Sequence, residues 1–192
     1  MIIVSTDGSC LRNPGGAIGW AWVNHQGSSR SGGAATGTNQ IAELRAVHEA
    51  IVAHPGPEPL LIESDSLYAI KCASEWISGW RINGWRTSSG AAVKNVEIIK
   101  QIDRAIASRP GPVRFRWVRG HVGNYFNEQA DALAGAAARQ AAVSSAVAEA
   151  ETVELAVVAA EETLAATQDK TTGPRASGKA VAPSAPQTLT LF

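Results

Sequence analysis

The chain has 192 residues with 17 basic and 17 acidic side chains, so its formal net charge is zero. Its length allows one domain of ordinary size with an appendage, and its two cysteines are too few for a disulfide framework, which favours reduced thiols in a cytoplasmic protein. No segment has the roughly 18 apolar residues that a membrane helix needs, and the apolar run 2–4 is too short for a signal peptide.

Charge and aromatic content change near residue 141. Residues 1–141 carry 14 basic and 11 acidic residues, a net charge of +3, whereas residues 142–192 carry 3 and 6, a net charge of −3. The segment 142–186 is rich in Ala and can bury too little apolar surface to offset its ordering entropy. We therefore predict a domain over 1–141 and a largely disordered tail over 142–186, with helix possible around 146–166 because Ala and Glu favour it.

The first half of the domain reads as three strands and a helix. Apolar and β-branched runs predict strands at 2–6, 18–24 and 30–36, joined by short links as in an antiparallel meander. A helix over 40–53 follows, with apolar residues at helical spacing and Asn39 as its expected cap.

The second half alternates between the two element types. We predict a strand at 60–63, helices at 66–76 and 93–107, a strand at 113–118 and a last helix at 128–139. A strand followed by a helical crossover and another strand implies parallel pairing. The predicted fold class is therefore α/β, with a five-stranded mixed sheet flanked by helices: the first three strands antiparallel, and the first, fourth and fifth parallel.

Four acidic residues are candidate metal ligands. Asp7 and Asp65 each follow an apolar strand, and Glu43 and Asp131 lie near the starts of two helices, so all four can meet in one crevice at the sheet edge. Oxygen ligands select Mg²⁺ or Mn²⁺, and two such ions about 4 Å apart can activate water against a phosphodiester. Taken singly, each acid could equally be a cap or a surface charge.

Four motifs carry a more specific resemblance. TDGSCLRNPGG (6–16), TNQIAELRAV (38–47), ESDSLYAI (63–70) and WVRGHVGNYFNEQADALA (117–134) resemble type 1 ribonuclease H, the bacterial RNase HI family. The resemblance implies an RNase H-like fold and endonucleolytic hydrolysis of the RNA strand of RNA–DNA hybrids, leaving 5′-phosphate and 3′-hydroxyl ends. It also implies that the four acids bind two Mg²⁺ ions, or Mn²⁺ in their place, in the substrate complex.

His121 lies in a predicted loop, within the run Gly-His-Val-Gly that has a glycine at each end. An imidazole that titrates near neutrality can move protons between water, leaving group and solvent. The resemblance makes His121 the candidate general acid/base, assisting rather than indispensable. The other histidines, His25, His48 and His54, are expected to be structural or exposed.

Recognition of a hybrid requires contacts that distinguish ribose from deoxyribose, and the 2′-hydroxyl is the group that differs. By resemblance, the residues that line the minor groove are Cys10, Asn13, Thr38, Asn39 and Gln40. Capping or turn formation is the alternative role for these polar side chains.

A tryptophan-rich segment resembles the basic protrusion with which the family grips the DNA strand. The expected contacts are Trp76, Trp80, Arg81 and Arg86. Relatives carry more positive charge where this chain has Ile82 and Asn83, so we expect an electrostatically weaker protrusion. The tryptophans could instead belong to the core.

The last six residues, 187–192, resemble peptides that dock bacterial replication and repair proteins on the sliding clamp. Gln187 would bind the pocket rim, and Leu189, Leu191 and Phe192 would provide the apolar contacts. A disordered tether would raise the local enzyme concentration near DNA. An arbitrary apolar terminus is the alternative, because short motifs recur by chance.

Three other functions are compatible with parts of this pattern. Transposases, integrases and junction resolvases share the fold and metal chemistry, but the GHVG loop and the TDGS start favour RNase HI. A non-catalytic hybrid-binding module should lack a metal ligand, and none of the four is missing. A clamp-tethered adaptor is disfavoured for the same reason. A monomer is the default expectation.

Overall fold

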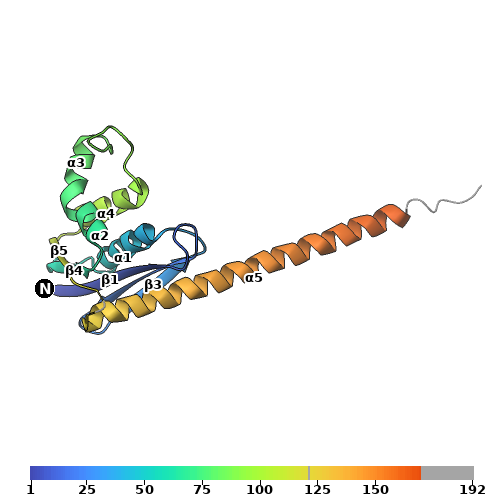
Figure 1. Cartoon of the computed structure of the whole chain (residues 1–192), viewed down its shortest axis with the longest axis horizontal. Coiled ribbons are helices and arrows are strands. Elements are labelled where there is room, and N and C mark those ends of the chain that lie inside the picture. Colours follow the sequence, from blue (N-terminus) through green and yellow to red (C-terminus); the bar gives the residue numbers. More distant parts are fainter. Residues whose placement is uncertain (121, 170–192) are drawn as a thin grey trace, which may run out of the picture. The chain divides into compact units, whose positions relative to one another are not determined.

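The computed structural model describes residues 1–120 and 122–169, with side chains up to Thr152 (Figure 1). The first of two compact units, Met1–Glu149, contains the sheet and the helices that cover it. None of the helices in these residues combines the length and apolar character that crossing a bilayer requires.

Five strands form one mixed sheet in the order β3-β2-β1-β4-β5. They are β1 (Ile2–Cys10), β2 (Ile18–Asn24), β3 (Ser29–Ala34), β4 (Leu60–Ser64) and β5 (Val113–Trp117). β2 pairs antiparallel with both β1 and β3, whereas β1–β4 and β4–β5 are parallel. The predicted mixed sheet is confirmed, including which strands are parallel.

The prediction that β1 ends before Asp7 was wrong. The strand continues to Cys10 because its second half pairs with β2, with Asp7 opposite Ala21 and Cys10 opposite Ile18. An Asp-Gly pair favours a turn locally, but ladder hydrogen bonds to a neighbouring strand override that preference. Asp7 therefore projects from within a strand, and its backbone is fixed on one side by β2.

Five helical segments precede β5: one lies between β3 and β4, and the other four lie between β4 and β5. They are α1 (Asn39–Ala53), α2 (Leu67–Lys71), the π-helical turn η1 (Cys72–Trp76), α3 (Ile77–Ile82) and α4 (Val96–Ser108). The helix predicted to end at Trp76 therefore continues to Ile82 through a π turn. α4 begins three residues later than predicted, after Asn95 in a left-handed conformation (φ 57°).

Thr38, and not Asn39 as predicted, caps α1. Its backbone is extended and its hydroxyl accepts a hydrogen bond from the N–H of Ile41. Asn39 is already helical, and its side-chain amide donates to Glu43 instead. Thr and Asn are both good caps, so the choice depended on backbone geometry that the sequence does not specify.

Helix α5 (Tyr125–Asp169) is much longer than the predicted 128–139. It starts earlier because the Asn124 side chain accepts a hydrogen bond from the N–H of Asn127. It then continues through 146–166, the segment whose Ala and Glu content favoured helix. Of the tail predicted to be largely disordered, 142–186, residues 142–169 are therefore helical. Residues 170–186 and the peptide 187–192 lie outside the described residues.

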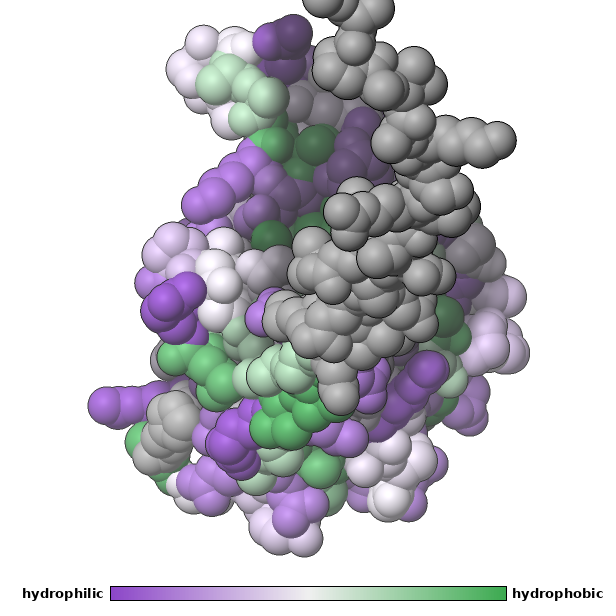
Figure 2. All heavy atoms as spheres, turned by 90° about the vertical axis from the view of Figure 1, so that its right-hand side faces the viewer, coloured by the Kyte–Doolittle hydropathy of each residue, from purple (hydrophilic) through white to green (hydrophobic). Residues whose placement is uncertain are grey.

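The hydrophobic core lies on the side of the sheet covered by α1 and α4 (Figure 1). Its fully buried members include Val4 and Ile62 from the sheet, Leu44 from α1 and Ile99 from α4. The first part of α5 packs on β2, where its backbone approaches Gly19. On the face shown in Figure 2, hydrophobic residues occur in small groups among hydrophilic ones.

Replacing Gly19 by Ala is expected to destabilise the domain. The added Cβ would overlap the carbonyl oxygen of Ala134 and the nitrogen of Ala138, which are backbone atoms of α5 and cannot rotate away. We expect the free energy of unfolding in urea to fall by about 1–3 kcal/mol, the usual cost of overpacking. Gly79→Ala is the control, because Gly79 is an exposed residue of α3 and nothing lies within 4 Å of its added Cβ. Equal stability of the two variants would contradict close packing of α5 on β2.

Candidate metal centre

Three buried or half-buried carboxylates lie together where β4 ends beside the middle of β1. Asp7, Glu43 and Asp65 each place one carboxylate oxygen within 4.8 Å of the others. Asp7 is 6% and Glu43 8% exposed. Asp7 comes from β1, Glu43 from the second turn of α1, and Asp65 from the residue that follows β4.

Strand register brings Asp7 and Asp65 together. Ser5 of β1 is the parallel partner of Glu63 in β4, and each aspartate lies two residues further along its own chain. Because side chains alternate along a strand, Ser5 and Asp7 lie on the same face of the sheet. The parallel strands β1 and β4 therefore bring the carboxylates of Asp7 and Asp65 together, as the sequence predicted.

Glu43 reaches this point because Gly8 has no side chain. A Cβ on Gly8 would overlap the backbone nitrogen of Glu43 and the carbonyl carbon of Ala42. The backbone of β1 and the second turn of α1 are therefore in direct contact. An Asp-Gly pair is a turn signal in a sequence, but the structure gives a different reason for this glycine, which is the close contact with the helix.

The fourth acid, Asp131 of α5, lies next to Asp7. Repulsion from Asp131 and a side-chain hydrogen bond with it both raise the pKa of Asp7. Asp131 is not part of the group of three whose carboxylate oxygens lie within 4.8 Å of one another, and it comes from α5.

The acids are electrostatically unfavourable without a cation. Burial, followed by repulsion from Asp65, raises the pKa of Asp7 to about 8. Burial, followed by repulsion from Asp7 and Asp65, raises the pKa of Glu43 well above its usual value. Within the described residues, the buried Oε2 of Glu43 has no hydrogen-bond partner. A divalent cation would relieve the repulsion and give this oxygen a partner, and an all-oxygen donor set suits a hard ion such as Mg²⁺.

One predicted substrate residue, Asn39, is hydrogen-bonded to the acid cluster, and a second, Asn13, is hydrogen-bonded to Asn39. The side-chain amide of Asn39 donates to Oε1 of Glu43 at 3.4 Å, and the N–H of Asn39 donates to Oδ1 of Asn13 at 3.3 Å. Asn13 and Asn39, 26 residues apart, therefore lie beside the metal site together.

The remaining predicted minor-groove residues surround this pair. Thr38 caps α1, and Gln40 follows in its first turn with a buried Oε1 that lacks a partner in the described part of the chain. Cys10 ends β1, and its thiol contacts the carbonyl of Arg12 at 3.3 Å. The structure thus brings all five residues to the same loop–helix junction near Glu43.

Asp65 is held by the last residue of β5 and by the segment that follows this strand. The indole Nε1–H of Trp117 donates to the Asp65 backbone carbonyl at 3.0 Å, and Gly120 lies against the Asp65 carboxylate so closely that a Cβ would overlap Oδ2. Sequence reasoning did not identify either residue. The W-x-x-G spacing within the motif at 117–134 is the signal that could have indicated them.

His121 lies outside the described residues, so its proposed role stays a prediction. The loop that contains it is fixed further along, where the N–H of Gly123 donates to Oε1 of Glu128 at 2.8 Å.

The predicted protrusion has two neighbouring indole rings. The Trp76 and Trp80 centroids are 5.5 Å apart, and both rings line a hollow of about 420 Å³ together with Asn83 and Thr87. Trp76 is 39% exposed, which makes it accessible to a ligand. The alternative that these tryptophans are only core residues therefore does not hold for Trp76.

Neither predicted arginine of the protrusion is unpaired. The Arg81 guanidinium forms a two-pronged ion pair with Asp103 of α4, which raises the pKa of Arg81. Arg86 donates to the carbonyl of Gly90 at 2.9 Å. Arg81 connects the protrusion to α4, a contact that the sequence did not predict.

Arg81→Ala is therefore expected to weaken hybrid binding only slightly. Its charge is already paired with Asp103, so we expect a change of less than about threefold and a loss of no more than about one unit in the slope of log K against log salt concentration. Fluorescence anisotropy with a catalytically inactive protein at several salt concentrations measures both. A loss as large as that from removing an acidic ligand would contradict this structural role.

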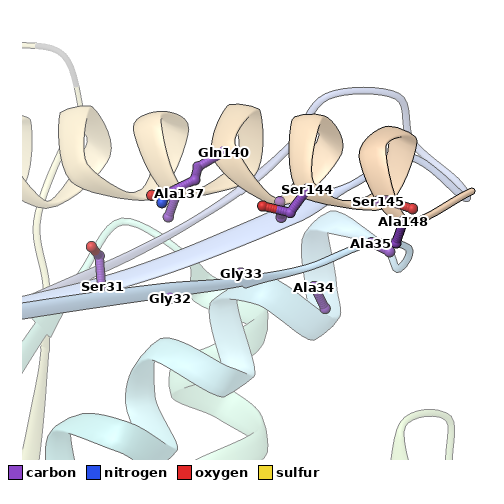
Figure 3. Close-up of a pocket in the computed structure, with 11 residues that line it drawn as sticks. Ser31, Gly32, Gly33, Ala34, Ala35, Ala137, Gln140, Ser144, Ser145 and Ala148 are labelled. Atoms are coloured by element: carbon purple, nitrogen blue, oxygen red, sulfur yellow. The ribbon is translucent and has the colours of Figure 1, made fainter. Parts of the chain in front are cut away.

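A second hollow, of about 560 Å³, lies between β3 and α5 (Figure 3). Small residues line it, among them Gly33, Ala137, Ser144 and Ser145, and none of the lining residues is titratable. It is separate from the four acids and offers no group for acid–base or metal chemistry.

Known proteins show the same combination of sequence and fold. The RNase H family model matches residues 1–139. A ribonuclease H of Tropheryma whipplei (strain Twist) is 43% identical over 146 residues, covering 76% of this chain and 89% of that protein. A ribonuclease H of Paracidovorax citrulli is 43% identical over 136 residues, covering 69% and 91%.

Solved structures of RNase H proteins and of a reverse transcriptase resemble the fold of this chain. A foamy viral protease–reverse transcriptase is 25% identical with a TM-score of 0.61, covering 71% of this chain and 93% of that one. LC9-RNase H1, a type 1 RNase H with the type 2 active-site motif, is 28% identical with a TM-score of 0.59, covering 72% of each chain. The N-terminal RNase H domain of a Mycobacterium tuberculosis protein, 20% identical with a TM-score of 0.57, shares the fold.

Proposed function

The chain belongs to the RNase H family and hydrolyses the RNA strand of RNA–DNA hybrids, and we propose that it does so with two divalent cations bound by Asp7, Glu43, Asp65 and Asp131. The observation that supports this site is the cluster of Asp7, Glu43 and Asp65, in which burial and mutual repulsion raise the pKa values of Asp7 and Glu43. Mg²⁺ is the proposed cofactor, with Mn²⁺ as a substitute, because the donors are oxygens.

Bound cations would supply a nucleophilic water and stabilise the leaving oxygen of the phosphodiester. The protein's own contribution is to hold the ligands in place. Asp7 is fixed by pairing with β2, Glu43 by its contact with Gly8, and Asp65 by Trp117. His121 is the proposed general acid/base that assists proton transfer, and the products carry 5′-phosphate and 3′-hydroxyl ends.

Hybrid selection is proposed to depend on two regions. The first is the loop–helix junction beside Glu43, where polar groups can read the 2′-hydroxyl of the RNA strand. Its residues are Cys10, Asn13, Thr38, Asn39 and Gln40. The second is the protrusion, where Trp76 and Trp80 offer ring faces to the DNA strand and Arg86 offers a charge, with Arg81 in a supporting position.

The test is cleavage of three labelled substrates, an RNA–DNA hybrid, double-stranded RNA and a branched DNA, by the wild type and by Asp65→Asn at several Mg²⁺ and Mn²⁺ concentrations. We expect cleavage of the hybrid alone, only with a divalent cation, and only by the wild type. Full activity of Asp65→Asn would refute the proposed site. Cleavage of branched DNA in preference to the hybrid would indicate a resolvase-like enzyme, and binding without cleavage would indicate a non-catalytic module.

The terminal peptide is proposed to dock on a bacterial sliding clamp through Gln187, Leu189, Leu191 and Phe192. In this arrangement residues 1–141 are the catalytic domain and 142–186 connect it to the clamp peptide. Deleting 187–192 should abolish clamp binding in surface plasmon resonance and leave cleavage of short hybrids unchanged. Clamp binding equal to that of the full chain would refute the proposal.

The remaining proposals concern the setting of the enzyme. Both cysteines are free, which fits a reducing cytoplasm. A monomer is proposed because one chain supplies all four acids, and sedimentation analysis tests it.

A further inference from the structure

A polar cluster lies on the sheet beside the metal site. Its centre is Glu63, which is 4% exposed and lies two residues before Asp65. Oε2 of Glu63 accepts a hydrogen bond from the Ser5 hydroxyl at 3.2 Å, and Oε1 accepts one from Nε of Arg116 at 2.9 Å. A buried carboxylate with these partners is satisfied and immobile.

His25, just after β2, connects this cluster to α5. Its Nε2 lies 3.0 Å from the Ser5 hydroxyl and 3.5 Å from Oε2 of Glu63. Because the Ser5 hydroxyl donates to Glu63, Nε2 is the donor to Ser5. Two sheet residues therefore fix the plane of the imidazole.

The imidazole ring of His25 stacks against the first turn of α5. Phe126 stacks on His25 with ring centroids 3.8 Å apart and an interplanar angle of 13°. Tyr125 in turn packs edge-on against Phe126. Stacked rings of this kind fix both the distance and the rotation of the helix start relative to the sheet.

Asp131 lies between two contacts of α5 with the sheet. Phe126 stacks on His25 before it, and Ala134 contacts the backbone of Gly19 after it. Ala21, the β2 partner of Asp7, lies between Gly19 and His25 in the sequence. The two contacts thus determine where Asp131 stands relative to Asp7.

We propose that His25 is a positioning residue for the metal centre: oriented by Ser5 and Glu63, it fixes α5 through Phe126 and so places Asp131 beside Asp7. The inference rests on the proposed function, since it concerns one of its four metal ligands. Asp131 is the ligand whose position depends on α5, because Asp7, Glu43 and Asp65 come from β1, α1 and the end of β4. The proposal gives a specific role to His25, which the sequence predicted only to be structural or exposed.

The test compares His25→Ala with His25→Phe. The alanine variant loses the stacked ring, and the phenylalanine variant keeps it. We expect the Kd for Mg²⁺, measured by isothermal titration calorimetry without substrate, to rise about tenfold in His25→Ala, the lower range for loss of a residue that supports a metal ligand. The Mg²⁺ concentration for half-maximal hybrid cleavage should rise by the same factor. His25→Phe should bring both quantities back to within about threefold of the wild type, and KM for the hybrid should stay within about twofold in both variants, because the substrate contacts are elsewhere.

His48→Ala is the matched control. His48 is also half-buried and next to a carboxylate, Glu49, but it lies on α1. Its cation dependence should equal that of the wild type. If His25→Ala fails to fold, as judged by circular dichroism, Phe126→Leu removes the same stack from the other side and should show the same tenfold rise.

The outcomes separate this inference from the proposed function. An unchanged cation requirement in a folded His25→Ala or Phe126→Leu protein would overturn the positioning role. Failure of His25→Phe to restore the requirement would overturn it too, because the stack would then not be the cause. Failure of the wild type to cleave hybrids would count against the proposed function instead.

Discussion

Asp7→Asn is expected to lower the rate of hybrid cleavage by about 10³-fold or more. Charge stabilisation by bound cations contributes several kcal/mol, and each 1.36 kcal/mol is a factor of about ten in rate. An amide keeps the size of the side chain but loses the negative charge that attracts the cation. Asp7 is central to the site, because it interacts with Glu43, Asp65 and Asp131. Single-turnover cleavage at saturating Mg²⁺ measures the effect.

The same substitution is expected to stabilise the cation-free protein at high pH. The pKa of Asp7 is raised from 3.8 to about 8 in the folded state, so folding favours its protonated form. The stability linked to this group is fully present below about pH 4 and is lost as the pH rises through 8. Asn cannot ionise, so the Tm of Asp7→Asn in a chelator should exceed that of the wild type at pH 9 and approach it at pH 4.

Loss of activity with a gain in stability distinguishes a missing ligand from an unfolded protein. Glu97→Gln is the control, because that side chain is 78% exposed on α4 and should change neither property. Wild-type cleavage by Asp7→Asn would contradict the proposed metal site. A Tm difference that is independent of pH would contradict the raised pKa.

The parts of the fold that local pattern determines were predicted from the sequence. β2 matches its predicted range residue for residue, because a run with the strand-forming residues Ile18, Trp20, Trp22 and Val23 is followed by a turn. The mixed sheet followed from the order of strands and helices. The four acids could be proposed together because a resemblance joined motifs that lie far apart in the chain.

Features that depend on tertiary proximity could not be predicted. The ion pair of Arg81 joins it to a residue 22 positions away, and the stacking of His25 on Phe126 joins the end of β2 to α5. Nothing in the sequence around Arg81 or His25 indicates these partners. The predicted cap of α1 was wrong by one residue. Thr38 and Asn39 have similar capping preferences, and the extended backbone at Thr38 decides between them.

Glycines were the least predictable part of the site. In the sequence, Gly8 indicates a turn and Gly120 indicates a flexible loop beside His121. In the structure, both make room for a metal ligand: Gly8 for the backbone of Glu43 and Gly120 for the carboxylate of Asp65. A glycine needed for close approach has the same local signature as one needed for a turn, so only the folded arrangement separates the two roles.

Gly120→Ala is accordingly expected to reduce hybrid cleavage by about 10²-fold, the usual cost of displacing a reacting group by about 1 Å. The added Cβ would overlap Oδ2 of Asp65, whereas the backbone of Asp65 is held by the indole of Trp117. The carboxylate must therefore rotate away from Asp7 and Glu43. We expect the Mg²⁺ concentration for half-maximal activity to rise as well, because one ligand no longer points at the cation.

Gly56→Ala is the matched control, since nothing lies within 4 Å of its added Cβ and it should cleave like the wild type. The double substitution Gly120→Ala with Asp65→Asn separates displacement from general damage to the loop. If Gly120 acts by making room for the Asp65 carboxylate, adding Gly120→Ala to Asp65→Asn should cost little further activity, because effects through a shared group are not additive. A further hundredfold loss in the double variant would show that Gly120 acts through another part of the loop.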